Sequence, residues 1–399
     1  MIFALAHSLS LSRALQARIL YLRGKATASA EGGRVSEEAE RMLADAVKLS
    51  PSIIDAWNCL GECFWERGEY ETAKHTFLGA LEHERTAATL CHLSMLLRTM
   101  SGAAGLNEAL LLESVSLAKE SVRLDPTNAG AWSGLGAAHF SCHIHVTASA
   151  EDLHLANRAY TQAAKVSSAE SADLICNHAM VLGLLDTTEP CLRQFTRAHE
   201  LDPQLGADGK RAEVWRDVVR VSEAIAAKRL AKTRKFSQMV AELPPAPGQG
   251  QGQGGGGGGG GGAGGGGPTA FTPLAQLSPG ANPGRAIAVK VVVAVPQAGM
   301  RLAASHMVLL VADAQEDLMA LTVYALRGVA TLDAGTTLEI TEPHLMKIEA
   351  TRFWEATAAE GASHASAGFH LLRVEDPAAT MRINGHPLRP SRPRAAPQR

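Results

Sequence analysis

The stretch DAWNCLGECFWERGEYETAKHTFLGAL, from Asp55 to Leu81, decides the fold of the first half of the chain. Its apolar residues recur at helical spacing on both sides of a break near Gly68, which predicts two antiparallel helices. Small residues let the two helices approach closely, and large ones fill the space between this pair and the next. The small residues are Gly61, Ala73 and Ala80, and the large ones are Trp57, Leu60, Phe64 and Phe77.

The same spacing recurs in five units between Gly24 and Pro203, and it is the spacing of the tetratricopeptide repeat (TPR). About three such units are needed to bury a continuous core, so five in phase predict a stable solenoid. The third and fourth units contain extra residues between their helices, and we expect a loop with His139, Cys142, His143 and His145 in one of them.

A polar helix is expected after the last repeat, from about Gly209 to Leu243. A solenoid needs such a cap, because its last repeat leaves an apolar face open. The buried stripe of the cap is predicted to be Val214, Val218, Val221 and Ile225. Its far end is basic, with Lys228, Arg229, Lys232, Arg234 and Lys235. These cations fit either a solvated helix end or contact with an acidic partner such as a phosphate backbone.

Residues 1–30 contain no acidic side chain, whereas Arg13, Arg18, Arg23 and Lys25 lie among apolar and small residues. This composition is typical of an organellar transit peptide. The alternative, which we favour, is an amphipathic helix that opens the first domain.

Composition divides the chain at the run of glycines before residue 268. Glycine brings no side chain to bury and loses much backbone entropy on folding, which favours a tether. We therefore expect a TPR solenoid with a capping helix at residues 1–243, a Pro/Gly-rich flexible linker at 244–268, a folded domain at 269–388 and a disordered basic tail at 389–399.

The second domain is predicted to be a small barrel of the oligonucleotide/oligosaccharide-binding (OB) type, because five strands and one short helix fit in about 110 residues. The helix is expected near residues 325–329. The strands are expected at Ala286–Val295, Met307–Ala312, Leu318–Tyr324, Thr337–Ile340 and Phe369–Val374. The predicted fold class is thus multidomain: an all-α TPR superhelix followed by a small all-β OB-fold barrel.

Several function classes are disfavoured by what the chain lacks. Its net charge of −2 excludes a uniformly basic nucleic-acid coat protein. No run of residues is long and apolar enough for a membrane span, so we expect a soluble protein without a membrane partner. The six cysteines show no paired short spacing and favour reduced intracellular thiols. No motif of an enzyme is found, and we expect no catalytic residue, cofactor, metal or small-molecule substrate.

The inner face of the solenoid is the candidate binding site. An acidic, amide and arginine lining suits a short peptide that carries both charge signs, although polar side chains on a solenoid can also be merely solvated. The residues at the positions that line such grooves are Asp55, Asn58, Glu62 and Trp65 in the second unit, and Met95 and Arg98 in the third.

The two halves, in this order, resemble the tetratricopeptide repeat protein 5 family. In the repeats the resemblance rests on AEGGRVSEEAERMLADAVKLSP (Ala30–Pro51), the stretch from Asp55 to Leu81, HLSMLLR (His92–Arg98) and KTRKFSQM (Lys232–Met239). In the barrel it rests on VYAL (Val323–Leu326), GTTLEITEPHL (Gly335–Leu345), RVEDP (Arg373–Pro377) and INGHP (Ile383–Pro387).

The resemblance implies a non-enzymatic adaptor that reads the N-terminal peptide of nascent tubulin at the ribosome and triggers decay of tubulin mRNA through a downstream adaptor. It implies that Arg98 lies in the peptide groove, and that Lys232, Arg234 and Lys235 face the ribosome. Asp208 is the nearest counterpart of an acidic groove residue of the family. The implied location is the cytoplasm.

Two alternatives stay open at this point. One is a nuclear stress-response scaffold whose barrel docks transcription cofactors. The weaker one is a protein that binds single-stranded nucleic acid through the barrel, which the few aromatic residues and low positive charge of the strands disfavour.

Overall fold

The computed structural model describes residues 2–30, 37–103, 106–230, 233–244, 271–296, 306–325, 332–351 and 366–388. The chain divides into two compact units. The first contains residues 1–146 and 155–170, and the second contains residues 147–154 and 171–399. Each unit is described by itself.

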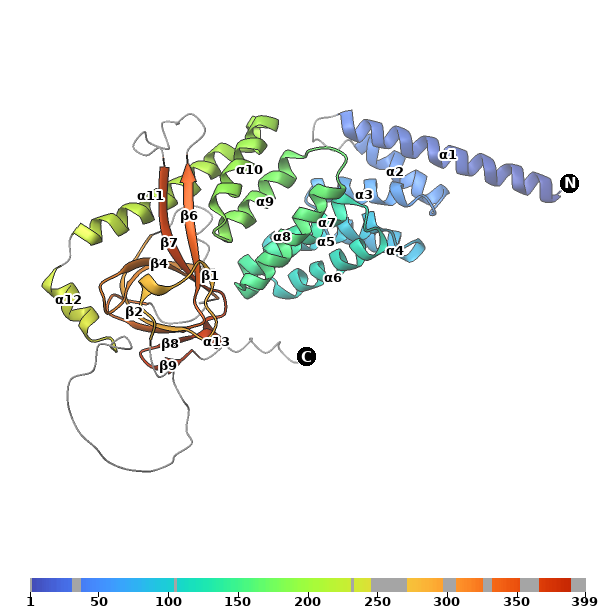
Figure 1. Ribbon diagram of the computed structural model, residues 1–399. Helices are drawn as coiled ribbons and strands as arrows, with labels where there is room; N and C mark the ends of the chain where they lie inside the picture. The colour runs from blue at the N-terminus through green and yellow to red at the C-terminus, as the bar shows by residue number, and fades with distance from the viewer. Residues whose placement is uncertain are drawn as a thin grey trace, which may run out of the picture. The chain divides into compact units, whose positions relative to one another are not determined.

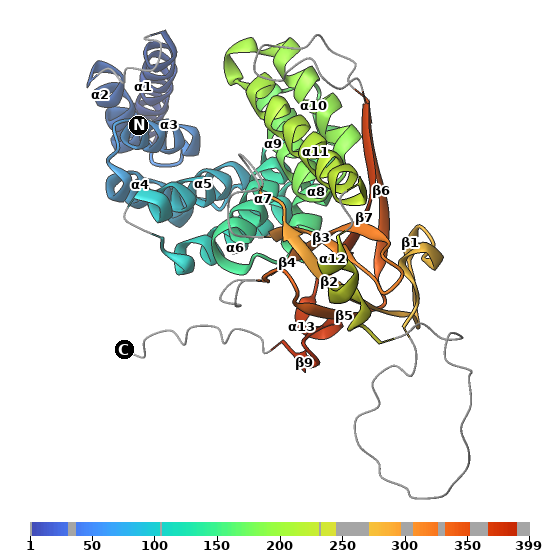
Figure 2. The same cartoon turned by 90° about the vertical axis from the view of Figure 1, so that its left-hand side faces the viewer.

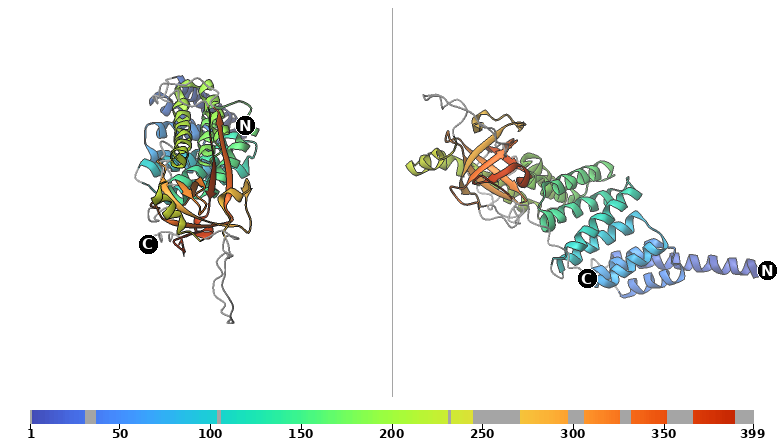
Figure 3. Two further views of the ribbon diagram at one scale, coloured as in Figure 1. Left: turned by 60° about the vertical axis from the view of Figure 1, so that its left-hand side comes forward. Right: turned by 90° about the horizontal axis from the view of Figure 1, so that it is seen from below.

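The first unit is built of antiparallel helix pairs, as Figures 1 and 3 show. Its helices are α1 (Ile2–Ala30), α2 (Glu37–Leu49), α3 (Ile54–Glu66), α4 (Tyr70–His83), α5 (Ala87–Ala103), α6 (Glu108–Leu124), α7 (Ala129–Cys142), the π-helical turn η1 (His143–Thr147) and α8 (Ala150–Val166). His139 and Cys142 lie within α7, and His143 begins a helical turn that continues it. The prediction that these residues lie in an inserted loop is therefore wrong.

Glycines mark the places where paired helices approach most closely. A methyl group added at Gly61 of α3 would lie 2.6 Å from the ring of Phe77 in α4. The equivalent Gly136 of α7 would bring a methyl group to 3.0 Å from Tyr160 of α8. Both pairs confirm the small-against-large packing predicted for the repeat, since the aromatic ring occupies the space that a side chain would need.

Tryptophan recurs at the fourth position of two repeats, and it has the same polar partner in both. The indole N–H of Trp57 donates a hydrogen bond to the carbonyl of Pro51 at 2.9 Å. That of Trp132 donates to the carbonyl of Pro126 at 2.8 Å. The tryptophan thus ties the start of its own repeat to the proline turn that ends the previous one.

The second unit joins the last helices to the barrel. Its helices are α9 (Ala172–Leu184), α10 (Thr188–Leu201), α11 (Ala207–Leu230), α12 (Arg234–Ala241) and α13 (Pro377–Thr380), with short 3-10 turns at Pro203–Leu205 (η2) and Leu274–Gln276 (η3). Its strands are β1 (Gly280–Ala281), β2 (Ala286–Ala294), β3 (His306–Ala312), β4 (Leu318–Tyr324), β5 (Thr337–Thr341), β6 (His344–Thr351), β7 (Ser366–Val374), β8 (Met381–Ile383) and β9 (His386–Pro387).

The strands form one curled sheet in the order β1-β6-β7-β4-β3-β2-β5-β8-β9. Strands β2, β3 and β4 form an antiparallel meander, and β7 then pairs with β4 in parallel. A sheet that curls in this way encloses the interior of a small barrel.

Both faces of the central strands are buried. Alternate residues such as Val289, Leu309 and Leu321 fill the barrel interior. The residues between them, such as Leu310 and Ala320, pack in one core with Trp215 of α11. Figure 2 shows α10 and α11 beside β6 and β7. Burial on two sides explains why β2 and β4 read as continuous apolar runs.

The five predicted strands are confirmed as β2, β3, β4, β5 and β7, and four further strands, β1, β6, β8 and β9, were not predicted. Of these, β6 is the longest. In the sequence, polar and apolar residues alternate strictly from Lys347 to Thr351, and in the structure these residues are alternately exposed and buried.

The capping region departs from the expected single helix. The predicted buried stripe is confirmed, since Val214, Val218, Val221 and Ile225 are all at most 5% exposed. However, α11 ends at Leu230, and a new helix begins after Thr233. Thr233 is extended, and its hydroxyl accepts a hydrogen bond from the Phe236 amide, so it is the N-cap of α12.

The domain boundaries stay a prediction. By their contacts, α9 to α12 group with the barrel rather than with the earlier repeats. The expected linker, apart from Pro244, the short helix after Ala325 and the basic tail lie outside the described residues.

Candidate functional site: a groove with an uncompensated arginine

The predicted groove residues of the first unit lie on α3 and α5. Asp55 and Met95 are exposed, whereas Glu62, Trp65 and Arg98 are half-buried. Asn58 is buried. No comparison or contact tests their role as a peptide site, which stays a prediction.

Arg98 is the most unusual of these side chains. Its Nη1 donates a hydrogen bond to the hydroxyl of Ser94 at 3.1 Å. Ser94 in turn donates to the backbone carbonyl of Ser114. Within the described part of the chain, no carboxylate forms an ion pair with Arg98, although burial of a charge is costly without one. The guanidinium is therefore held by its own repeat and retains donors for another partner.

The surroundings of Arg98 are poorly solvated. Burial lowers the pKa of Arg98, and the nearby Tyr160, Cys91 and Cys142 partly offset this. Burial also raises the pKa values of Cys91 and Tyr160, with Arg98 acting in the opposite direction on both. A carboxylate that entered here would interact with Arg98 more strongly than in water.

Two other groove residues already have partners within the unit. The side-chain carbonyl of Asn58 accepts a hydrogen bond from the Thr89 hydroxyl at 2.9 Å, and among the described residues no partner is found for its NH2 group. Glu62 lies 3.1 Å from Nε2 of His92.

Asp208, the remaining predicted groove residue, lies in the second unit at the start of α11. It is half-buried, and its carboxylate is 3.9 Å from Nδ1 of His199.

The predicted basic contact is described in part. Arg234 and Lys235 occupy the first turn of α12 and are exposed, whereas Lys232 lies outside the described residues. Two cations at a helix N-terminus are unfavourable for the helix dipole. Their position is therefore not explained by helix stability.

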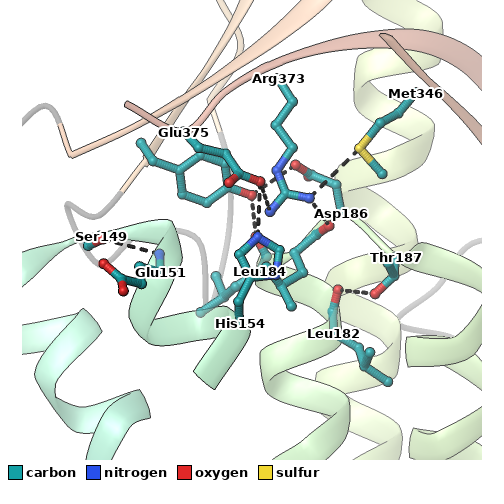
Figure 4. Close-up of polar contacts among 12 residues, drawn as sticks. Ser149, Glu151, His154, Leu182, Leu184, Asp186, Thr187, Met346, Arg373 and Glu375 are labelled. Atoms are coloured by element: carbon teal, nitrogen blue, oxygen red, sulfur yellow. Dashed lines mark hydrogen bonds and ion pairs between the residues drawn. The ribbon is translucent and has the colours of Figure 1, made fainter. Parts of the chain in front are cut away.

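A polar cluster in the second unit, which the sequence analysis missed, holds the barrel against the end of α9 (Figure 4). The hydroxyl of Tyr324 lies 2.6 Å from the carbonyl of Leu184 and 3.1 Å from the carboxylate of Asp186. Arg373 Nη1 donates to the carbonyl of Leu185 at 3.1 Å. These carbonyls end α9, where the helix dipole is negative, so the barrel supplies the C-terminal cap of a repeat helix.

Arg373 has further partners in this cluster. Its Nη2 is 3.0 Å from the carboxylate of Glu375, and its guanidinium lies 5.1 Å from the centre of the Tyr324 ring. His154 Nε2 is 3.0 Å from the same oxygen of Glu375. The hydrogen bond from His154 and the charge of Arg373 hold the pKa of Glu375 below its ordinary value. The sequence signals for this cluster are the VYAL and RVEDP motifs, which contain Tyr324 and Arg373, but the sequence does not reveal their distant partners.

The two cysteines of α3 are held in their neutral form by burial. Burial raises the pKa of both Cys59 and Cys63 to about 11, so the two thiols are protonated at neutral pH. Among the described residues, no three potential ligands lie close enough together for a metal ion. In the same ranges no helix has the length and apolar character that a membrane span requires. The absence of enzymatic activity and of cofactors stays a prediction.

Comparison with known proteins gives consistent results for both halves. The family model of the tetratricopeptide repeat protein 5 OB fold domain matches residues 268–396. Tetratricopeptide repeat protein 5 of Homo sapiens is 31% identical over 281 residues, which cover 69% of this chain and 63% of that protein. The Mus musculus protein is 30% identical over 285 residues, covering 70% of this chain and 64% of that protein.

The Bos taurus protein is 33% identical over 234 residues, which cover 58% of this chain and 53% of that protein. The matched part of the chain thus spans between 53% and 64% of the length of these relatives. The repeats, the OB-fold barrel and these matches together show that the chain is similar to tetratricopeptide repeat protein 5 over 58% to 70% of its length, and that residues 268–396 match the OB fold domain of that family.

Proposed function

We propose that this protein is an adaptor that captures the N-terminal peptide of a nascent tubulin chain at the ribosome and recruits a factor that leads to decay of the tubulin message. The observation that carries the proposal is Arg98, a half-buried guanidinium without a carboxylate partner among the described residues. The similarity to that family gives the class of peptide. The proposal assumes that the protein acts in the cytoplasm, where translation takes place.

The chemistry of Arg98 suits the capture of an acidic side chain. A guanidinium can form two parallel hydrogen bonds with one carboxylate, which fixes orientation as well as adding energy. Burial lowers the pKa of Arg98, and a bound carboxylate would act in the opposite direction.

The neighbouring groove residues would read other parts of the peptide. The NH2 group of Asn58 can donate to a peptide carbonyl, and the exposed Met95 offers a deformable apolar contact. Asp55 and Glu62 provide negative charge for a basic residue or a free amino terminus. Trp65 would add apolar contact, and Asp208 remains a candidate for a second acidic contact.

The exposed Arg234 and Lys235 of α12, with Lys232 before them, are proposed to contact the phosphate backbone of ribosomal RNA. Such contacts are electrostatic and weaken as salt concentration rises. Reversing the three charges should abolish co-sedimentation with ribosomes while peptide binding is retained. Unchanged co-sedimentation would instead favour the nuclear scaffold.

A role of the barrel in binding single-stranded nucleic acid is not favoured. OB folds use the outer face of their second and third strands for this purpose. Here the outward residues of β3 and β4, such as Leu310 and Ala320, are buried against the helices of the same unit.

Crosslinking during translation tests the proposal. A photoreactive group at Met95 should crosslink to nascent tubulin whose N-terminus has just left the ribosome. Arg98→Ala should remove the crosslink and leave helical content unchanged. Arg123→Ala is the matched control, because Arg123 is exposed on α6, the other helix of the same repeat. Equal crosslinking by Arg98→Ala and the unchanged chain would contradict the proposal.

A further inference from the structure

A pocket of about 450 Å³ lies in the second unit, between α11 and the hairpin of β6 and β7. Figure 2 shows these elements side by side. The pocket is distinct from the groove around Arg98, which belongs to the first unit.

Part of the lining of the pocket is apolar. Ile225 of α11, Leu318 of β4 and Ile348 of β6 line it, and each is about 5% exposed because it also belongs to the core. Phe369 of β7, which is half-buried, lies directly opposite Ile348 in the strand register. An apolar side chain entering here would be removed from water against these residues.

The rim of the pocket carries an excess of positive charge. Arg229 is exposed, and no hydrogen bond or ion pair is found for it within the described ranges. Lys347 forms an ion pair with Glu349 on its own strand, and His370 lies opposite Lys347 on β7. Glu349 is the acidic residue of this rim. One cation of the rim is therefore left without compensation even when His370 is neutral.

Strand β6 has an open edge next to this rim. It pairs with β7 along its whole length, from His344 to Thr351. On its other side it pairs with β1 only through His344 and Leu345. From Met346 onward, no strand in the described part of the chain pairs with that edge. Open edges of this kind can bind an extended peptide as an additional strand.

We propose that this pocket binds an acidic, extended segment of a partner protein. The segment pairs with the edge of β6, an apolar side chain enters the pocket beside Ile348 of that strand, and a neighbouring carboxylate contacts Arg229 and Lys347. A peptide fits better than a nucleic acid, because an extended peptide can pair with the open edge of β6 and the pocket offers a single half-buried aromatic ring for stacking.

The test is selection from a library of random dodecapeptides displayed on phage, with the full chain as target. The expected result is enrichment of sequences in which Asp or Glu lies within two positions of Leu, Ile or Phe. The affinity of one enriched peptide is then measured by fluorescence anisotropy with variants of the full chain.

The double variant Arg229→Glu and Lys347→Glu should weaken binding at least tenfold. Lys228→Glu is the matched control, since Lys228 precedes Arg229 on α11 and does not line the pocket. It should change the affinity less than threefold. Arg98→Ala should have no effect, so failure of this proposal is distinguishable from failure of the proposed function.

The backbone of the same peptide tests the strand pairing. N-methylation at successive positions should reduce affinity at alternate residues only, because alternate amides of an added strand face β6. Absence of an acidic consensus, equal binding by the double variant or indifference to N-methylation would each overturn the proposal.

Discussion

Arg98, the predicted groove arginine, and Arg373 of the barrel are both withdrawn from water, but they differ in what surrounds them. Arg373 has a backbone carbonyl, a carboxylate and an aromatic ring as partners within its own unit. Arg98 has one hydroxyl group. A buried guanidinium is costly unless it is compensated, so Arg373 is an arginine that holds the fold, whereas Arg98 has the surroundings that the proposed ligand contact requires.

The largest effect is expected for Arg373→Met. It should destabilise the second unit by about 3 kcal/mol, because it removes a buried hydrogen bond and leaves the Leu185 carbonyl without its charged partner. Denaturant unfolding of the full chain measures this change. Hydrogen exchange should accelerate in α9 and β7 but not in α3 to α6. An unchanged free energy of unfolding would show that Arg373 is not a structural contact.

Low pH should decrease the free energy of unfolding of the second unit, because His178 of α9 is buried. Burial lowers the pKa of His178 to about 4, and Gln194 is 3.2 Å from its Nδ1. In the unfolded chain the ordinary value is 6.5, so the unfolded state binds a proton first. Stability is therefore complete above pH 6.5 and decreases as pH falls toward 4, by about 3 kcal/mol.

Unfolding by denaturant at pH 7 and pH 5 measures this loss. His178→Gln cannot titrate and should reduce the difference between the two pH values. If the variant retains the full pH dependence, another group is responsible. Protonation of His178 should lower the stability of the second unit, which contains Arg373, and leave the stability of the first unit, which contains Arg98, unchanged.

Arg98→Met should change the stability of the first unit by less than about 1 kcal/mol, because methionine keeps an apolar stem and removes a desolvated charge. Capture of an acidic peptide should nevertheless fall at least tenfold. Thermal unfolding and peptide binding, measured on the same preparation, separate the two effects. A large loss of stability would place Arg98 in the same class as Arg373.

The smallest effect is expected for Glu375→Gln. It should decrease the free energy of unfolding by about 0.5 kcal/mol, because the Glu375 side chain is 43% exposed and its ion pairs are screened by solvent. Denaturant unfolding at low and high salt measures it. A loss as large as that of Arg373→Met would show that the ion pair, rather than the contact with the Leu185 carbonyl, holds the barrel.

Much of the fold could be predicted because its signals are local. Gly61 and Phe77 are close in sequence, and their spacing alone places the small residue against the large one. The apolar runs of β2 and β4 similarly identified strands buried on both faces. Strand β6 was missed although its alternation is visible, whereas the break at Thr233 depends on a single capping residue.

The sequence by itself determined the repeat, the barrel and the candidate arginine of the groove, because helix packing and strand burial follow short-range patterns of residue size and polarity. Only the tertiary structure decided that Arg98 has no carboxylate partner among the described residues, and that Tyr324 and Arg373 cap α9. Those contacts join residues as far apart as Leu185 and Arg373, and whether a charge is compensated depends on which distant side chains the fold brings to it.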